Sequence, residues 1–234
     1  MDKLIAKSRI TEVNDVATRM LGTFKKSGLT DPYLLSTFTA LDAGNTKLTL
    51  AIRRSKAESD LETMDEVRDN KVRSFYYLVQ GFSHHPTKTI QEAAQSLLKV
   101  FDNYGLAMVG ESYATESSLV NSLLLDLTKP KFQVSIALLS GCVELIAELQ
   151  VAQTDFEQAR IAYEAEKAID GMQNNASELK KEVVELINNK ILVYLGAMQQ
   201  VDPVTFGVFA STCAQIIADN NEQVKKRGKK PEPE

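Results

Sequence analysis

The residues best suited to chemistry in this sequence are two adjacent histidines, His84 and His85, which stand directly before Pro86. Zinc and iron sites need ligands that converge from separate elements or from positions three or four apart on one helix. Adjacent histidines point apart. The positions three residues ahead of them are Gly81 and Phe82, not the glutamates that di-iron bundles use. We therefore predict that both histidines are helix-end residues in a turn, without a metal.

Carboxylates four residues apart lie on one helix face and could divide acid and base roles. Three such pairs occur: Glu62 with Glu66, Asp65 with Asp69, and Glu144 with Glu148. Their positions are typical of solvated helix faces. The sequence has no phosphate-binding glycine loop, nucleophile elbow, zinc-protease motif or paired-cysteine motif. We therefore predict a protein that is not an enzyme and uses no cofactor.

Polar residues interrupt two apolar helical seams. Asn45 takes a seam position in a helix expected near 34–56, and Arg68 does so in a helix expected near 60–82. If these helices form a hairpin that turns near residue 57, the two side chains lie at nearly the same height. Asp69 is then close enough to pair with Arg68, as burial of an isolated guanidinium is very costly.

Two roles are open for this polar group. It could be a layer that fixes the register between long helices, a purpose that one buried asparagine or ion pair can serve. It could instead be the floor of a small-ligand pocket between the hairpins, with Tyr76 and Tyr77 among the lining residues. We favour the register layer and keep a ligand-binding bundle as the alternative.

The elements that position these residues are predicted to be helices, because a period of 3.6 dominates and strand alternation is hard to find. Gly28 should end a first helix, and Asp31 with Pro32 should begin the next. Ser59 and Glu62 have the spacing of a capping box, which predicts that a new helix begins there.

The second half of the chain shows the same pattern. A long helix is expected over 132–168, with a coiled-coil-like seam of alternating four- and three-residue steps. Its members are Leu138, Cys142, Leu145, Leu149, Ala152, Phe156, Ala159 and Tyr163. The sequence thus predicts an all-α fold, an elongated bundle of about eight helices built from two long helical hairpins.

Short similarities suggest a degenerate tandem duplication, since ESDL at 58–61 resembles ASEL at 176–179. The half-repeats would be 8–105 and 106–221, within a single domain over 1–221. Residues 222–234 are rich in charge and proline, and we predict that they form a disordered tail.

Composition narrows the classes of function. The net charge is −4, and residues 222–234 carry five basic and three acidic groups, so the remaining body is near −6. The negative charge of this body disfavours the binding of nucleic acid, except through the basic tail. Cys142 and Cys213 suit small buried side chains in a reduced compartment. Apolar runs are too short for a membrane span, so we expect a cytoplasmic protein.

Four stretches resemble an uncharacterised bacterial family of helical proteins that is known only as a domain of unknown function. They are SGLTDPYLLSTF, NTKLTLAIRR, the SDL…RDN element at 59–70, and FYYLVQG at 75–81. The resemblance would cover most of residues 8–221. It implies a cytoplasmic bacterial all-α protein and brings no catalytic residue, cofactor or partner with it.

The function that these observations favour is that of a non-catalytic helical interaction or scaffold protein. Long seams present extended surfaces to a protein partner. A homo-oligomer would follow if the seam over 138–163 exceeds what its partner within the chain covers.

Overall fold

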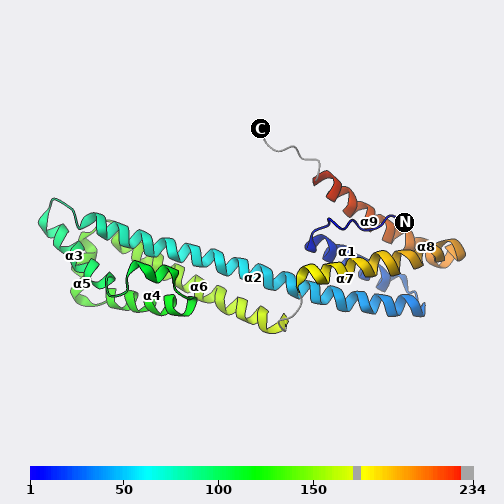
Figure 1. Ribbon diagram of the computed structural model, residues 1–234, viewed down its shortest axis with the longest axis horizontal. Helices are drawn as coiled ribbons and strands as arrows, with labels where there is room; N and C mark the ends of the chain where they lie inside the picture. The colour runs from blue at the N-terminus through cyan, green and yellow to red at the C-terminus, as the bar shows by residue number, and fades with distance from the viewer. Residues whose placement is uncertain (171–174, 228–234) are drawn as a thin grey trace. The chain divides into compact units, whose positions relative to one another are not determined.

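The computed structural model describes residues 1–170 and 175–227, and these residues form helices joined by short turns (Figure 1). The predicted all-α class is confirmed, with no strand in either described range. The helices are α1 (Ile10–Ser27), α2 (Pro32–Phe82), α3 (Lys88–Phe101), α4 (Tyr113–Leu127), α5 (Pro130–Leu138), α6 (Cys142–Asp170), α7 (Ala176–Leu186), α8 (Leu192–Val201) and α9 (Pro203–Arg227). A 3₁₀ turn, η1 (Leu106–Gly110), precedes α4, and a π-turn, η2 (Ile187–Ile191), joins α7 to α8.

The chain divides into two compact units. Unit 1 combines Met1–Ser55 with Glu166–Glu234, and unit 2 is Lys56–Ala165, inserted between those two segments. The contacts therefore group the chain differently from the half-repeats 8–105 and 106–221. The tandem duplication itself stays a prediction.

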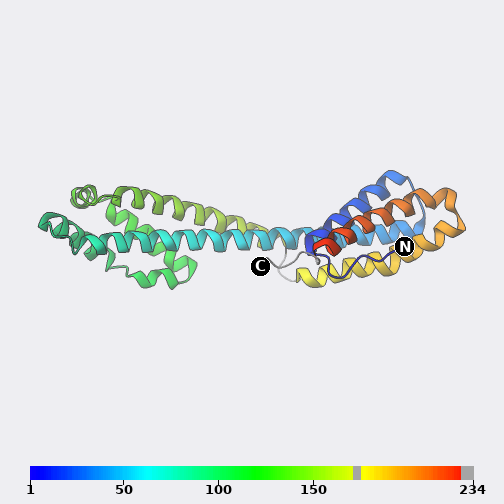
Figure 2. The same ribbon diagram turned by 90° about the horizontal axis from the view of Figure 1, so that it is seen from above.

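Unit 1 buries one face of the first part of α2 against α1, α7, α8 and α9. In both views α9, orange to red, lies beside α1, blue (Figures 1 and 2). The α2 face is the predicted seam. Four of its apolar members, Leu34, Phe38, Leu41 and Leu48, are buried, and Ile52 is half-buried. The Phe38 ring stacks on Phe24 of α1 with centroids 4.2 Å apart, which fixes α1 on α2.

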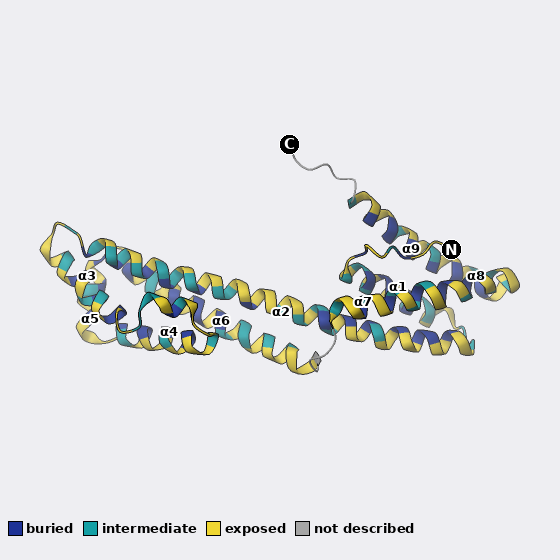
Figure 3. Cartoon of the chain, in the orientation of Figure 1, coloured by how far each residue is buried: buried dark blue, intermediate teal, exposed yellow. Residues whose placement is uncertain are grey.

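Unit 2 has its own core, formed by the second part of α2 with α3, η1, α4, α5 and α6. Figure 3 shows the buried positions of α2 as separate dark bands between exposed ones, as expected of an amphipathic helix. Val72, Phe75 and Val79 supply this face, and Phe75 lies against Phe101 of α3. Leu123 of α4 and Leu149 of α6 close the core from the other side.

The predicted hairpin that turns near residue 57 is wrong, because α2 is one helix of 51 residues. Ser59 does not cap a new helix. Its carbonyl oxygen instead accepts from the Thr63 hydroxyl at 2.8 Å, a bond to the fourth residue ahead within a helix. The chain between Asn45 and Gln80 contains no glycine or proline, so nothing there breaks the backbone hydrogen bonding.

The predicted helix over 132–168 is also wrong, because α5 and α6 meet at a bend of 116°. Gly141 lies in the bend with a φ of 82°, a left-handed conformation that glycine adopts without strain. Leu138, the first expected member of the seam, is 48% exposed, whereas Cys142 is fully buried. The seam therefore begins at Cys142.

The last helix runs further than we predicted. α9 continues through Arg227, where the predicted disordered tail would have begun at residue 222. Val224 is buried, and the Arg227 guanidinium donates to the Lys7 carbonyl oxygen at 3.2 Å and pairs with Glu12. These contacts order residues 222–227. The rest of the predicted tail, 228–234, lies outside the described residues.

In the ranges 1–170 and 175–227, no single helix has both the length and the apolar composition of a membrane span. The bent pair α5 and α6 meets these criteria only when the two helices are counted together.

Replacing Gly141 with alanine should destabilise unit 2 by about 1–2 kcal/mol, the usual cost of a left-handed conformation for a residue with a Cβ atom. A Cβ atom there meets no neighbour within 4 Å, so the cost is conformational rather than steric. Chemical denaturation measures the change. Gly81→Ala is the matched control. It lies in α2 with equal free space and should be neutral or slightly stabilising, so equal effects of both variants would contradict this account.

Candidate functional site

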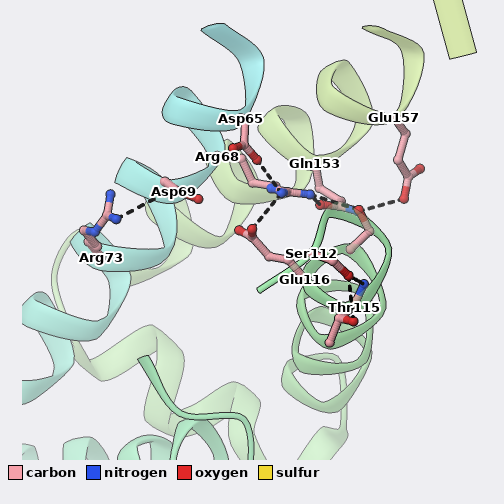
Figure 4. Close-up of polar contacts among 10 residues, drawn as sticks. Asp65, Arg68, Asp69, Arg73, Ser112, Thr115, Glu116, Gln153 and Glu157 are labelled. Atoms are coloured by element: carbon pink, nitrogen blue, oxygen red, sulfur yellow. Dashed lines mark hydrogen bonds and ion pairs between the residues drawn. The ribbon is translucent and has the colours of Figure 1, made fainter. Parts of the chain in front are cut away.

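Arg68 is the most unusual residue of unit 2, because its long charged side chain is completely buried. It lies on the core-facing side of α2, one helical turn before Val72, among side chains that α4 and α6 direct at it (Figure 4). The sequence placed it correctly in an apolar seam. A guanidinium in such a position must find its partners within the protein.

Three helices supply those partners. The Arg68 Nη2 atom lies 2.6 Å from Asp65 Oδ1 of α2 and 2.8 Å from Glu116 Oε2 of α4. Its Nη1 atom donates to Ser117 Oγ at 2.9 Å and to Gln153 Oε1 of α6 at 3.4 Å. The guanidinium thus ties α2, α4 and α6 together at one level of the core (Figure 4).

The guanidinium also lies on an aromatic ring. Its Cζ atom is 3.6 Å from the ring centroid of Phe156, close enough for a cation–π interaction. Tyr113 packs edge-on against the same ring, with the centroids 5.2 Å apart. The ring therefore stabilises the charge from the side that the carboxylates leave open.

A second set of hydrogen bonds holds these partners in place. Gln153 donates to Glu157 at 2.7 Å, and Asn121 of α4 donates to the same Glu157 oxygen at 2.9 Å. Ser112 caps α4, and Glu116 follows in its first turn, where the helix dipole favours a negative charge. The position of Glu116 thus depends on where α4 begins.

Two carboxylate oxygens of the cluster are buried without a hydrogen-bond donor, Glu116 Oε1 and Asp69 Oδ1. The other Asp69 oxygen accepts from Arg73 at 3.2 Å. With Asp65 included, three carboxylates face the two guanidinium groups of Arg68 and Arg73. The fully ionised cluster therefore has a net charge of −1, which a single proton neutralises.

The surroundings of Glu116 favour that proton on its carboxyl. Burial, opposed by the Arg68 charge, raises the pKa of Glu116 to about 8. The hydrogen bond that a protonated Glu116 can donate to Asp69, and nearby negative charge, act in the same direction. Burial likewise raises the pKa of Asp65. A protonated Glu116 can donate to Asp69, which satisfies both oxygens that otherwise have no partner.

Asp65, Asp69 and Glu116 are also the described residues best placed to hold a metal ion, since one oxygen of each lies within 4.8 Å of the others. A divalent cation would need further oxygen ligands and would share this space with the Arg68 guanidinium, which already contacts two of the three carboxylates. The cluster therefore fits a shared proton better than a cation.

The structure separates the site residues that the sequence had grouped. Asp69 is part of the cluster, but it pairs with Arg73, whereas the carboxylates that pair with Arg68 are Asp65 and Glu116. Asn45 belongs to unit 1, where it accepts from Asn14 at 2.9 Å and donates to Thr18 at 3.0 Å. The expectation of one layer that contains both Asn45 and Arg68 is wrong, because it depended on the hairpin near residue 57.

The two predicted tyrosines belong to neither group. Tyr76 packs on Phe101 and on Tyr77, with ring centroids 5.0 and 5.3 Å apart, and Tyr77 is 58% exposed. Arg68 has no surface in contact with solvent and so cannot form the floor of an open pocket.

Sequence reasoning missed Glu116, Ser117 and Gln153. A signal for Glu116 exists, since it continues the row of Val120, Leu123 and Leu127 in steps of four, three and four. An acidic residue in one apolar seam and an arginine in another indicate a buried pair between the two helices.

The histidines lie where we predicted, in the turn between α2 and α3. The main-chain N–H of Thr87 donates to His85 Nδ1 at 3.1 Å, and His84 is exposed. The predicted burial of both cysteines is confirmed. Cys142 and Cys213 are fully buried, and burial raises the pKa of their thiols to about 11 and about 12.

Residues 58–206 match the model of a family of unknown function, DUF6261. This range is more than half of the chain and contains the whole Arg68 cluster. The chain belongs to the DUF6261 family. The resemblance to a domain of unknown function is thereby confirmed. No curated protein and no solved structure matches the DUF6261 chain.

Replacing Arg68 with methionine should lower the free energy of unfolding by about 3 kcal/mol, because buried polar groups lose a shared partner. Adding Glu116→Gln should recover part of the loss, since an ionisable carboxyl no longer remains beside the vacated site. Arg73→Met is the control, because that side chain is 42% exposed and its ion pair should contribute less than about 1 kcal/mol. Urea denaturation measures all three. An Arg68→Met chain as stable as the wild type would contradict this account.

The free energy of unfolding should fall as the pH rises from about 5 to about 8. In this range folded Glu116 keeps a proton that the unfolded chain, with a pKa near 4.5, has released, so raising the pH favours unfolding. Glu116→Gln should reduce the slope but not remove it, because the raised pKa of Asp65 acts in the same sense. The exposed Glu66→Gln variant should keep the full slope. A Glu116→Gln chain with the wild-type slope would show that Glu116 is ionised in the fold.

Proposed function

We propose that this DUF6261 protein is a non-catalytic interaction protein that binds an amphipathic helix of a protein partner on unit 2. The observation that carries the proposal is a groove where aliphatic side chains of α2 and α6 are open to solvent. Its volume is about 320 Å³, and Val67 and Val151 in its wall are 40% and 59% exposed. The groove is lined by Val67, Lys71, Ala147, Glu148, Val151, Ala152 and Asp155.

The spacing of these residues suits a helix. Val67 and Lys71 are one turn apart on α2, and Ala147 and Val151 are one turn apart on α6. A partner helix with aliphatic side chains at positions i and i+4 can place them between these two rows.

The charges of the groove indicate the chemistry of the partner. Lys71 pairs with Glu148 across the two helices at 2.6 Å, and Asp155 adds a second acidic group. The groove is therefore acidic overall, and it should favour a helix that carries lysine or arginine beside its aliphatic face.

The Arg68 cluster gives this groove a rigid base. Ala152 lines the groove, and the next residue, Gln153, bonds to Arg68 in the core. The buried cluster thus fixes α6 against α2 where their outer faces form the groove, which reduces the cost of ordering the site on binding.

Val151→Glu tests the proposal, because it adds a charge to the apolar wall of an already acidic groove. A protein captured by the wild type from its native cells, then purified, should bind the variant at least tenfold more weakly in calorimetry. Val204→Glu in α9 is the matched control, since Val204 is 92% exposed in unit 1, and it should bind normally.

Two outcomes would overturn the proposal. One is that the Val151→Glu variant captures the same proteins as the wild type and binds them with the same affinities. The other is self-association of the wild type that Val151→Glu abolishes in sedimentation, since the groove would then bind a second copy rather than a partner.

A further inference from the structure

The segment ahead of α1 is held on unit 1 by asparagine side chains that bond to its main chain. We call this segment, Lys3–Ser8, the arm. Asn188 of η2 bonds both main-chain groups of Leu4. Its Oδ1 accepts from the Leu4 N–H at 2.8 Å, and its Nδ2 donates to the Leu4 carbonyl at 3.0 Å.

Asn221 of α9 does the same for the residues on either side. Its Nδ2 donates to the Lys3 carbonyl at 2.8 Å, and its Oδ1 accepts from the Ile5 N–H at 3.1 Å. Two amide side chains therefore satisfy four consecutive main-chain groups, from the Lys3 carbonyl to the Ile5 N–H. This resembles what a neighbouring strand does when a peptide joins a sheet edge. After these groups the arm turns, since the Ser8 N–H donates to the Ile5 carbonyl at 2.9 Å. We call Asn188 and Asn221 the amide pair.

Two arm side chains are also recognised. Leu4 is 2% exposed and belongs to the core of unit 1, and Ser8 is 1% exposed and accepts from Asn220 at 2.9 Å. Lys180 and Arg227 donate to the arm carbonyls of Ala6 and Lys7 at 3.0 and 3.2 Å. The site thus selects an aliphatic residue and, four positions later, a hydroxyl residue.

The local structure at the amide pair is unusual. Asn188 lies in the π-turn η2, which adds a residue to the turn and so changes the direction in which the side chains project. Hollows of about 390 and 360 Å³ border the arm, and Asn188 and Lys3 line both. π-turns are rare and occur often at binding sites, so this one supports a recognition role.

We propose that the amide pair and the core side chains that bury Leu4 form a binding site for a polypeptide segment, and that a second copy of this chain can supply its arm to it. The contacts from Lys180, Asn188, Asn220, Asn221 and Arg227 join the arm to residues far along the chain, so another copy can make them with the same geometry. The structure shows how the arm of this chain fits the site. We therefore take the arm of a second copy as the occupant.

Within one chain, the arm competes with any incoming copy at an effective concentration on the order of millimolar. Exchange is therefore measured best when the intrachain pairing is disabled. Leu4→Asp disables the arm and leaves the amide pair free, whereas Asn188→Ala with Asn221→Ala disables the amide pair and leaves the arm free. This proposal is independent of the α2–α6 groove.

The first experiment tests the site. A fluorescent peptide with the sequence of residues 2–9, DKLIAKSR, is titrated into the full-length Leu4→Asp chain and followed by anisotropy. It should bind saturably. The affinity should fall at least tenfold when Asn188→Ala and Asn221→Ala are added. If circular dichroism shows that Leu4→Asp is unfolded, Leu4→Ala replaces it.

The second experiment tests the exchange. The Leu4→Asp chain is mixed with the Asn188→Ala/Asn221→Ala chain in sedimentation velocity. The mixture should contain a heterodimer that neither chain forms alone, and excess unlabelled peptide should dissociate it.

Peptide binding without a heterodimer would overturn the exchange and show that the site takes a segment of a different polypeptide. Failure of the peptide to bind any folded arm variant would overturn the site itself.

Discussion

The buried guanidinium of Arg68 is the constraint on which the packing of unit 2 depends. A charge with no contact to solvent must be surrounded by groups that neutralise it and accept its hydrogen bonds. Here Glu116 brings in α4, Gln153 brings in α6, and the Phe156 ring covers the remaining side. Apolar side chains alone would allow these helices to slide or rotate with little penalty. A fork-shaped donor with fixed partners allows one arrangement.

Unit 1 fixes the packing of its elements with neutral amide side chains instead of a buried charge. Asn45 links α2 to α1, and Asn188 and Asn221 bind the main chain of the segment that precedes α1. An amide carries a donor and an acceptor, so one side chain can satisfy both main-chain groups of an extended residue without a charge to desolvate. The two units thus differ in the kind of polar group that they bury. Charge specifies the packing of one, and polypeptide backbone recognition is built into the other.

The sequence predicted the helical class, the α2 seam and the burial of Arg68, because these follow from the spacing of apolar residues over many turns. The capping-box pattern of Ser59 and Glu62 was misleading, since the same residues are compatible with the middle of an exposed helix. The bend at Gly141 was missed because the apolar steps continue across it. Both errors concern where a helix ends. Helix ends depend on the local backbone conformation, which the spacing of apolar residues does not predict.

Most partners of Arg68 and those of Leu4 were missed for a different reason. Leu4 and Asn188 are separated by 184 positions, and no local pattern connects a main-chain group to a distant amide. For Glu116 a pattern existed, but its pairing with Arg68 could be recognised only once α4 was known to pack on α2.

We expect a single proton, held by Glu116 and shared with Asp69, to neutralise the cluster around Arg68. Carbon-13 NMR of the Glu116 side-chain carboxyl, assigned with the Glu116→Gln chain, measures this directly. We expect a protonated carboxyl at pH 6 that titrates near pH 8 in the folded protein. A carboxyl that is already ionised at pH 6 and titrates near 4.5 would contradict it.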